Sequence, residues 1–133
     1  MTQKLPNLIH TARRARLHAR AEYSGFKVGA ALETRNGKVY TGCNVENSTY
    51  GLSVCAERVA LWKALSEGET VFRRLIVVAN SNSLTPPCGA CRQIIWEYCG
   101  NIPIVLSNLG GKKTSYRMSD LLPLPFDHQF LGK

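Results

Sequence analysis

The sequence predicts an α/β fold in which a five-stranded mixed sheet lies between two layers of helices, a three-layer αβα sandwich. Apolar residues recur at helical spacing near the N-terminus, residues 75–79 form a continuous run rich in β-branched side chains, and helical and strand-like segments alternate along the 133 residues. Elements in such an order pack as layers around one core, and this length suits one domain. We therefore expect a single domain over residues 1–133.

The first half of the chain predicts one helix and a hairpin. An amphipathic helix is expected over residues 6–20, where the following apolar side chains recur in steps of three and four: Leu5, Leu8, Ile9, Ala12, Ala15 and Ala19. Two strands, residues 26–32 and 38–41, flank Asn36-Gly37, a dipeptide that tolerates positive φ and favours a tight turn. These strands are expected to pair in antiparallel fashion.

The middle of the chain predicts a buried helix and a buried strand. Residues 53–65 are apolar on nearly every side, which indicates a central helix, and Gly68 follows just beyond its end. The run at residues 75–79 is typical of a strand that is covered on both faces, so we expect it in the centre of the sheet.

The last part of the chain predicts a third helix and two more strands. The helix spans residues 88–98 and stops before Gly100, and the strands span residues 102–106 and 114–118. The resulting order, αββαβαββ, predicts helices on both faces of the sheet.

The charge balance raises the possibility of nucleic-acid binding. The chain has 17 basic and 9 acidic residues, a net charge of +8. The densest basic cluster comprises Arg13, Arg14, Arg16, His18 and Arg20, positions that fall largely between the apolar positions of the first helix. Aromatic residues make up only 8% of the chain and do not interleave with these cations, as stacking on single strands requires. We interpret the cluster as a solvated helix face and expect no nucleic-acid polymer as a partner.

The N-terminus and the cysteines indicate the compartment. Residues 1–10 lack the continuous apolar segment of a secretory signal, and no segment approaches the length of a membrane span. The five cysteines, an odd number, have a spacing that favours metal binding over disulfides. We expect a cytoplasmic protein without a membrane partner.

Two cysteine motifs predict a zinc site. They are Cys55-Ala56-Glu57 and, at residues 87–91, Pro-Cys-Gly-Ala-Cys. Cys88 and Cys91 are three residues apart, so on the first turn of a helix they can hold one ion. With Cys55 they supply three thiolates to Zn²⁺, which leaves the fourth tetrahedral position for water, as in catalytic sites. A redox pair would need neither a third cysteine nor the Cys-Ala-Glu sequence.

Glu57 is the expected proton carrier beside the metal. In a regular helix, side chains two residues apart diverge by about 200°, so we expect Cys55 at the irregular start of the second helix and Glu57 in its first turn. A surface carboxylate favoured by the helix dipole, worth about 0.3–1 kcal/mol, would explain the residue type but not the neighbouring ligand.

The charge of the sulfurs also needs compensation. Three thiolates with Zn²⁺ have a net charge of −1, which weakens the acidification of water unless neighbours withdraw charge. Both motifs are expected at helix N-termini, where backbone N–H groups favour thiolates. Arg58 and Arg92 each follow a motif residue and could donate to a ligand sulfur. Arg58 is the one that we expect in this role, whereas a surface position suits Arg92 equally well.

Three further motifs accompany the cysteines. They are Tyr-Ser-x-Phe-x-Val-Gly-Ala-Ala at residues 23–31, Thr-Gly-Cys-Asn-Val-Glu-Asn at residues 41–47, and Leu-Leu-Pro at residues 121–123 before Phe126. With them, the chain resembles the short, homotetrameric class of cytidine deaminases over nearly its whole length. It departs from that class at residues 20–22, Arg-Ala-Glu, where many members have an aromatic residue and a proline.

The resemblance implies a reaction and a cofactor. The reaction is the hydrolytic deamination of cytidine and 2′-deoxycytidine to uridine and 2′-deoxyuridine with release of ammonia, in pyrimidine salvage. Zn²⁺ would be the cofactor, with a zinc-bound hydroxide that attacks C4 while Glu57 shuttles protons. The partner would be a small nucleoside.

The resemblance also implies the substrate contacts. Asn44 and Glu46 would bind the ribose hydroxyls, Phe26 would form an aromatic wall near the pyrimidine, and the backbone of Ala56 would meet the polar edge of the base. Phe126 would complete the site of a neighbouring subunit in a homotetramer.

Two alternatives stay open. The chain could deaminate another substrate, either a polynucleotide base or an aminopyrimidine such as a modified cytidine or blasticidin S. It could also be a noncatalytic zinc module that binds partners through its basic surface, but such a site normally closes with a fourth protein ligand. Finding Cys43 or Cys99 on the metal would favour that module.

Overall fold

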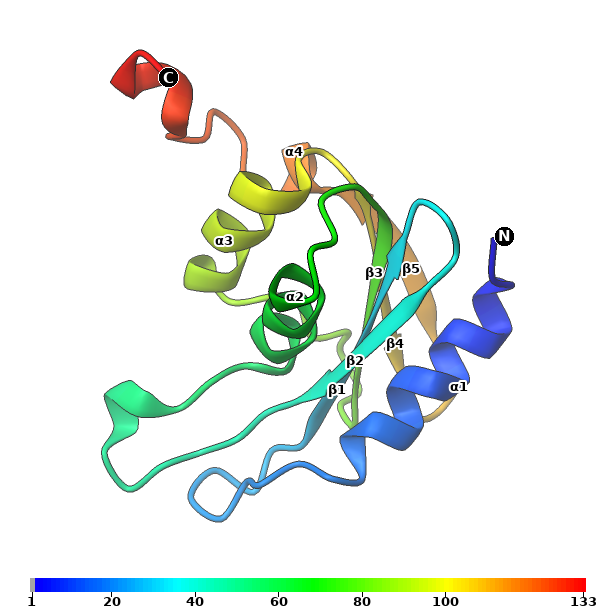
Figure 1. The fold of residues 1–133 in the computed structure, drawn as a ribbon. Coiled ribbons are helices and arrows are strands. Elements are labelled where there is room, and N and C mark those ends of the chain that lie inside the picture. The colour runs from blue at the N-terminus through cyan, green and yellow to red at the C-terminus, as the bar shows by residue number, and fades with distance from the viewer. Residues whose placement is uncertain (1) are drawn as a thin grey trace.

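The computed structural model describes residues 2–133, which form an α/β fold with a five-stranded mixed sheet flanked by helices (Figure 1). This confirms the expected fold class. The elements are α1 (Leu5–Arg16), β1 (Val28–Thr34), β2 (Val39–Cys43), η1 (Tyr50–Leu52), α2 (Ala56–Ser66), β3 (Phe72–Ala79), α3 (Gly89–Cys99), β4 (Pro103–Asn108), β5 (Lys113–Arg117), α4 (Met118–Leu121) and η2 (His128–Leu131). Strands lie in the order β2-β1-β3-β4-β5, so β3 is central, as expected.

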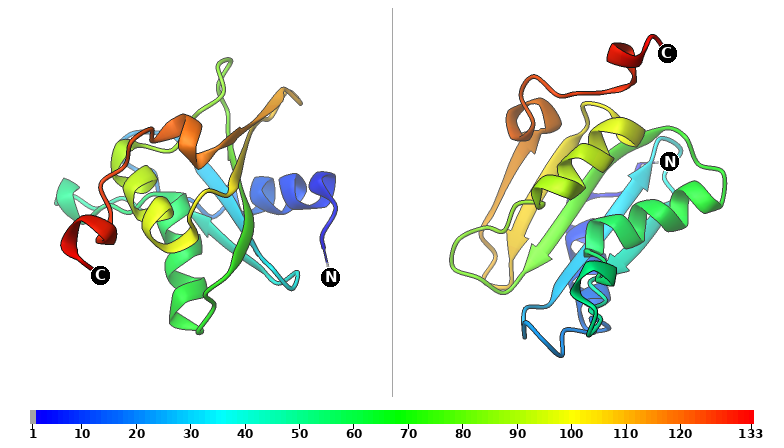
Figure 2. Two further views of the ribbon diagram at one scale, coloured as in Figure 1. Left: turned by 90° about the horizontal axis from the view of Figure 1, so that it is seen from above. Right: turned by 90° about the vertical axis from the view of Figure 1, so that its left-hand side faces the viewer.

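Strand directions follow from the connections. β1 pairs antiparallel with both β2 and β3, and β4 pairs antiparallel with β5. Only β3 and β4, among the strands of residues 2–133, are parallel, and a parallel pair needs a crossover, which α3 provides. The crossover returns the chain along the sheet face that α2 already covers (Figure 2).

The hairpin between β1 and β2 closes as the sequence predicts. Gly37 has a φ of +91°, and the Gly37 N–H donates to the Thr34 carbonyl over 3.1 Å. The Thr34 N–H donates to the Lys38 carbonyl over 2.8 Å. β1 begins and ends two residues later than the expected strand 26–32, and β2 begins one residue later and ends two residues later than the expected strand 38–41.

The predicted extent of the first helix, residues 6–20, is wrong at its C-terminal end. α1 ends at Arg16, because the following segment turns to pair with another loop. The Arg20 N–H donates to the Asn44 carbonyl over 2.9 Å, and the Glu46 N–H donates to the Arg20 carbonyl over 2.8 Å. His18 and Arg20 therefore lie outside the helix, whereas Arg13 and Arg14 are exposed on it as expected.

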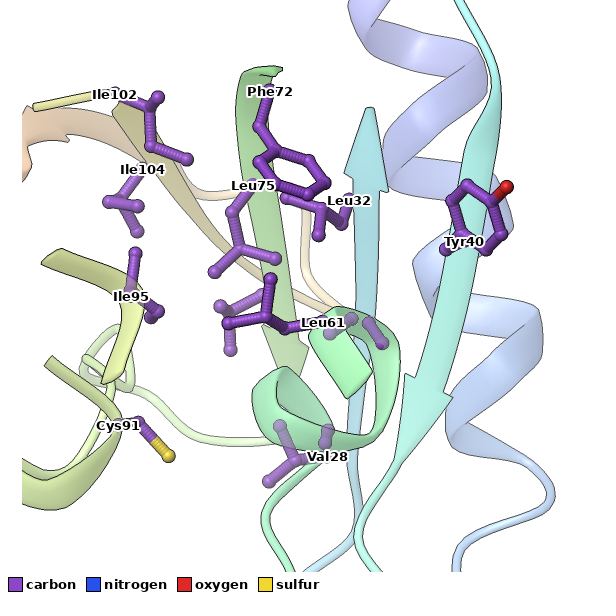
Figure 3. Close-up of a cluster of buried hydrophobic side chains, with 14 of the residues drawn as sticks. Val28, Leu32, Tyr40, Leu61, Phe72, Leu75, Cys91, Ile95, Ile102 and Ile104 are labelled. Atoms are coloured by element: carbon purple, nitrogen blue, oxygen red, sulfur yellow. The ribbon is translucent and has the colours of Figure 1, made fainter. Parts of the chain in front are cut away.

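The sheet separates two apolar layers. Leu75 and Val77 of β3 pack with α2 and α3, whereas Ile76 and Val78, which alternate with them, pack against α1. Figure 3 shows the larger cluster, to which α2 contributes Leu61, and α3 contributes residues such as Ile95. The core thus fixes both helices that carry the cysteine motifs.

Two glycines allow the helices to approach the sheet closely. A Cβ atom on Gly42 of β2 would lie 2.6 Å from the Ala60 nitrogen of α2 and closer still to the Ala56 carbonyl oxygen. A Cβ on Gly29 of β1 would meet α1 in the same way, 2.7 Å from the Arg16 nitrogen. Glycine at position 42 therefore allows the start of α2 to pack closely against β2.

The C-terminal part differs from the prediction. The expected strand at residues 114–118 ends at Arg117, since the Arg117 N–H donates to the Asp120 carboxylate over 2.9 Å and starts α4 with Met118. β5 forms one edge of the sheet, and its residues are mostly exposed. Within residues 2–133, no helix combines the length and apolar character needed to cross a bilayer.

Candidate metal and substrate site

The three cysteines of the two motifs come together although 36 residues separate the first from the last. The sulfurs of Cys55, Cys88 and Cys91 all lie within 4.8 Å of one another, and those of Cys55 and Cys88 are 3.7 Å apart. In a tetrahedral zinc site with Zn–S bonds of about 2.3 Å, neighbouring sulfurs are about 3.8 Å apart. The donor set therefore fits Zn²⁺.

Helix starts position the sulfurs. Cys55 is the N-cap of α2 and has an extended backbone, with φ −74° and ψ 155°, and Cys88 is the N-cap of α3. Cys91 lies in the first turn of α3 and is fully buried. The predicted arrangement of Cys55 before the helix and Glu57 inside its first turn is confirmed. Two positive helix ends thus face one cluster of thiols.

The charge on the thiols is distributed unevenly. Hydrogen bonds from Cys91 first, and from Arg58 and Cys88 after it, lower the pKa of the Cys55 thiol to about 5, against the effect of its partial burial. The pKa of Cys91 is raised, because its thiol donates to Cys55 and because it is buried. Cys55 therefore becomes a thiolate more readily than Cys91 does.

The two arginines have different roles. Arg58 Nη2 donates to the Cys55 sulfur over 3.4 Å, and its guanidinium lies 6.0 Å from the centre of the Trp62 ring. Arg92 instead donates to the carbonyl oxygens of Pro87 and Leu121, each over 2.8 Å. Arg92 therefore links the loop before α3 to the end of α4. The prediction that it could donate to a ligand sulfur is wrong.

Glu57 lies beside the sulfurs in a buried position. Its side chain is on the first turn of α2 and only 5% of the residue is exposed. Burial, and secondarily the negative charge of Cys55, raise the pKa of its carboxyl to about 7. A carboxyl with this pKa can both accept and release a proton near neutral pH.

A cavity of about 420 Å³ opens onto Glu57 and two of the sulfurs. Its size is within the usual range for small-molecule sites. It is lined by Ser24, Phe26, Val28, Asn44, Glu46, Tyr50, Ser53, Val54, Cys55, Ala56, Glu57, Arg58, Thr85, Pro86 and Cys88. The structure thus brings Phe26, Asn44, Glu46 and Ala56 to the same cavity as Glu57.

Several lining residues were absent from the predicted site. Ser24 belongs to the motif at residues 23–31, which was the one signal available for it. Tyr50, Ser53, Thr85 and Pro86 lie outside the strands and regular helices, and no spacing pattern marks them. Their place in the site depends on how the loops fold over the sheet.

Asn44 and Glu46 are held in place by the backbone of the opposite segment. Asn44 Nδ2 donates to the Phe26 carbonyl and its Oδ1 accepts from the Val28 N–H, both over 2.8 Å. The Glu46 carboxylate accepts from the N–H groups of Tyr23 and Ser24, each over 3.0 Å. These bonds join the start of β1 to the segment that follows β2.

Phe126 lies apart from this cavity. It is 59% exposed and stacks on Phe130 with 5.5 Å between the ring centres. Gln93 Nε2 donates to the Phe126 carbonyl over 2.8 Å, and Trp96 Nε1 donates to the Asp127 carboxylate over 2.9 Å. The C-terminal segment is thus tied to α3 while its aromatic side chain faces outward.

The other cysteines do not join the metal-binding group. Among residues 2–133, the cluster of three or more candidate ligands contains Cys55, Cys88 and Cys91 and neither Cys43 nor Cys99. Burial raises the pKa of the Cys99 thiol to about 12, which keeps it protonated. The group of ligands in the described residues therefore leaves a coordination position open, which argues against the noncatalytic zinc module.

Comparisons with known proteins agree with this geometry. Residues 2–106 match the family described as the cytidine and deoxycytidylate deaminase zinc-binding region. The cytidine deaminase of Sporosarcina psychrophila is 46% identical over 126 residues, which cover 94% of this chain and 93% of that protein.

A solved structure and a more distant relative extend the comparison. The crystal structure of cytidine deaminase from Burkholderia pseudomallei has a TM-score of 0.91 and 46% identity and covers 93% of this chain and all of that one. The blasticidin-S deaminase of Bacillus cereus is 30% identical over 107 residues, which cover 74% of this chain and 76% of that protein.

Proposed function

The chain belongs to the cytidine and deoxycytidylate deaminase zinc-binding family, and from this premise we propose that it hydrolyses cytidine and 2′-deoxycytidine to uridine and 2′-deoxyuridine with release of ammonia. Its activity is that of a cytidine deaminase, a zinc hydrolase. The observation that carries the proposal is the cluster of three thiols beside buried Glu57 in a cavity of nucleoside size. Pyrimidine salvage is the corresponding physiological role.

Cys55, Cys88 and Cys91 would hold the zinc ion. When bound, zinc lowers the pKa of a coordinated water from 15.7 toward about 7. Arg58 draws negative charge from the Cys55 sulfur through its hydrogen bond, so that less charge reaches the metal.

Glu57 would move the protons of the reaction. Its carboxylate accepts a proton from the attacking water and gives it to ring N3, which makes C4 more electrophilic. The carboxylate, ionised again, then takes the proton of the hydroxyl group now on C4 and gives it to the exocyclic amine, so that the C4 carbonyl forms as the bond between C4 and this nitrogen breaks and ammonia leaves. A raised pKa suits both transfers, because neither form of the carboxyl is strongly favoured near neutral pH.

The substrate would lie between the metal ligands and the loop after β2. Asn44 and Glu46 would bind the ribose hydroxyls, and Phe26 would cover the pyrimidine ring. The N–H groups in the first turn of a helix have no intrahelical acceptor, so the backbone N–H of Ala56 can donate a hydrogen bond to the polar edge of the base.

A homotetramer with shared sites is the corresponding assembly. The outward position of Phe126, on a segment tied to α3, supports a contact with the site of a neighbouring subunit. Five free cysteines support a reducing compartment such as the cytoplasm, and two apolar clusters on one sheet support a single domain over residues 1–133.

A second candidate substrate is blasticidin S, because a deaminase of that compound is among the relatives. An ultraviolet assay tests both substrates, since loss of the 4-amino group changes the absorbance of the pyrimidine. We expect cytidine and 2′-deoxycytidine to be converted by the zinc-loaded protein, with neither blasticidin S nor a cytosine-containing oligonucleotide converted at comparable kcat/KM. Preference for blasticidin S would favour the alternative, and no conversion of any cytosine compound would contradict both.

A further inference from the structure

The turn at Tyr23 and Ser24 makes an unusually complete contact with one carboxylate. Glu46 Oε1 accepts from the backbone N–H groups of both turn residues, and Oε2 accepts from the Ser24 hydroxyl and, over 3.4 Å, from Asn44 Nδ2. An ionised carboxylate has about four acceptor positions, so all of them are engaged. The carboxylate that is proposed to meet the ribose is therefore already oriented.

The Ser24 hydroxyl has a second contact, with the backbone of Phe26 two residues further along the chain. While it donates to Glu46, it accepts from the Phe26 N–H over 3.0 Å. One hydroxyl therefore links the proposed ribose-binding carboxylate to the proposed aromatic wall. The backbone donors to Glu46 lack this link, because an N–H group cannot accept a hydrogen bond.

The position of this turn depends on such bonds. Residues 21–27 lie between α1 and β1 outside any helix or strand, and Tyr23, Ser24 and Phe26 are exposed. Within the turn, the Gly25 N–H donates to the Ala21 carbonyl over 2.9 Å. The Tyr23 ring meets the Tyr50 ring edge-on, with 5.9 Å between the ring centres. Hydrogen bonds to Glu46 and Asn44 supply the polar contacts that hold the segment.

We infer that Ser24 is a positioning residue for the nucleoside, which orients Glu46 toward the ribose hydroxyls. The inference rests on the proposed function. On binding, a ribose hydroxyl takes the acceptor position now used by Asn44 Nδ2, whose 3.4 Å contact is the longest of the four. The Ser24 hydroxyl stays on Oε2 and keeps the carboxylate from rotating.

The electrostatics of the carboxylate agree with this role. The Ser24 hydroxyl is the first cause of a pKa of Glu46 below its usual range, followed by the Ser24 backbone N–H. An ionised carboxylate accepts hydrogen bonds from sugar hydroxyls more strongly than a neutral carboxyl does.

The experiment compares Ser24→Ala with Ser24→Thr, which restores a hydroxyl, on two substrates. Steady-state kinetics are measured with cytidine and with 2′,3′-dideoxycytidine, which lacks the 2′- and 3′-hydroxyls. Where turnover of the latter is slow, its competitive inhibition of cytidine deamination gives the affinity. We expect Ser24→Ala to raise the KM for cytidine about tenfold with kcat changed less than about threefold. We expect its affinity for the dideoxy compound to stay within about twofold of wild type, and Ser24→Thr to recover most of the loss.

A double-mutant cycle separates positioning from general destabilisation. In a Glu46→Ala background, Ser24→Ala should add less than about twofold to the KM, because the two residues act as one unit. Equal losses on both substrates, or an undiminished effect in the Glu46→Ala background, would overturn the inference and leave Ser24 with a structural role only.

Stability and activity controls keep the outcomes distinct. Thermal unfolding of each variant is recorded, and if Ser24→Ala does not fold, Ser24→Cys, which is close in size and a weaker donor, goes through the same comparison. If wild type converts cytidine and the pattern above fails, the inference alone is wrong. If wild type does not convert cytidine, the proposed function itself is wrong.

Discussion

At the scale of single residues, Glu57 and Arg58 are neighbours in the chain with opposite effects on the metal site. Glu57 is buried with a pKa near neutrality, whereas Arg58 is held against the Cys55 sulfur and near the Trp62 ring. The acid is available for proton transfer, and the arginine lowers the negative charge of the ligands. Their substitution should therefore separate chemistry from metal binding.

Glu57→Gln should abolish proton transfer while leaving zinc in place. The amide has nearly the same shape but cannot exchange a proton near neutral pH, so we expect kcat to fall by a factor on the order of 10²–10⁴. Metal content, measured by atomic absorption, should stay at the wild-type level because Glu57 is not in the thiol cluster. Substantial turnover by the zinc-loaded variant would contradict the role of Glu57.

Arg58→Gln should weaken metal binding instead. Removing a hydrogen bond to a ligand typically lowers metal affinity by about 10- to 100-fold, which competition with a chromogenic chelator measures. Arg13→Gln is the matched control, because Arg13 is exposed on α1, far along the chain from the sulfurs. Equal zinc affinities in the two variants would show that the 3.4 Å contact has no influence on the metal.

At the scale of elements, the site is built where two helices begin. Cys55 and Cys88 are N-caps of α2 and α3, which come from different sides of β3 in the sequence and meet on one face of the sheet. The close approach of α2 to β2 at Gly42 fixes how far its first turn reaches into the cavity. The distance between β2 and α2 therefore affects the position of the Cys55 sulfur at the start of α2.

Gly42→Ala should disturb both stability and metal binding. The added Cβ forces α2 away from β2, which we expect to lower the free energy of unfolding by about 1–3 kcal/mol and to reduce zinc affinity. Gly29→Ala should lower stability similarly with less effect on zinc, since its clash is with α1.

Gly51→Ala serves as the neutral control for this pair, because its Cβ would meet no atom within 4 Å. Denaturant unfolding and chelator competition measure the two quantities. A Gly42→Ala protein with wild-type zinc affinity would contradict the coupling between β2 and the site.

Local signals predicted the elements, and long-range contacts set their limits. Asn36-Gly37 and the paired cysteines act over a few residues, so the turn and the start of α3 could be placed from sequence, whereas α2 begins at Ala56, three residues after the expected start. The end of α1 depends on pairing between Arg20 and the loop at Asn44, and the carbonyl partners of Arg92 lie up to 29 residues away. The spacing of apolar residues along the chain carries no information about such contacts.

The same difference between local sequence signals and long-range contacts applies to the candidate site. The three thiols and Glu57 lie in two short motifs, and sequence alone grouped them correctly in space. The contact of Ser24 with Glu46 spans 22 residues and joins two loops, so only the folded chain shows it.

At the scale of the whole molecule, exposed aromatic residues gather on the C-terminal segment. Phe126 and Phe130 stack on each other and face outward, while Asp127 is buried and bonded to Trp96. A segment anchored at one residue and exposed at the next is suited to docking on a neighbour.

Mixing two inactive variants should restore activity if sites are shared. We expect Phe126→Ala to lose at least about tenfold in kcat/KM through the missing aromatic contact. When Phe126→Ala and Glu57→Gln chains are refolded together, hybrid assemblies contain sites with an intact Glu57 from one chain and an intact Phe126 from another. Activity above the sum of the separate variants, followed by light scattering and the ultraviolet assay, is the expected result.

Phe130→Ala is the control, since its ring stacks on Phe126 from the same exposed surface. Mixed assemblies with no gain over their components would contradict a shared site.

The composition of β5 has a consequence for self-association through backbone pairing. This strand lies at the border of the sheet, and its outer side pairs with no other strand of residues 2–133, the kind of border on which fibrils grow. Lys113 and Arg117 stand at its two ends and Lys112 directly precedes it, so a second β5 approaching edge to edge would meet like charges. Electrostatic repulsion at this border therefore disfavours extension of the sheet by a second copy of β5.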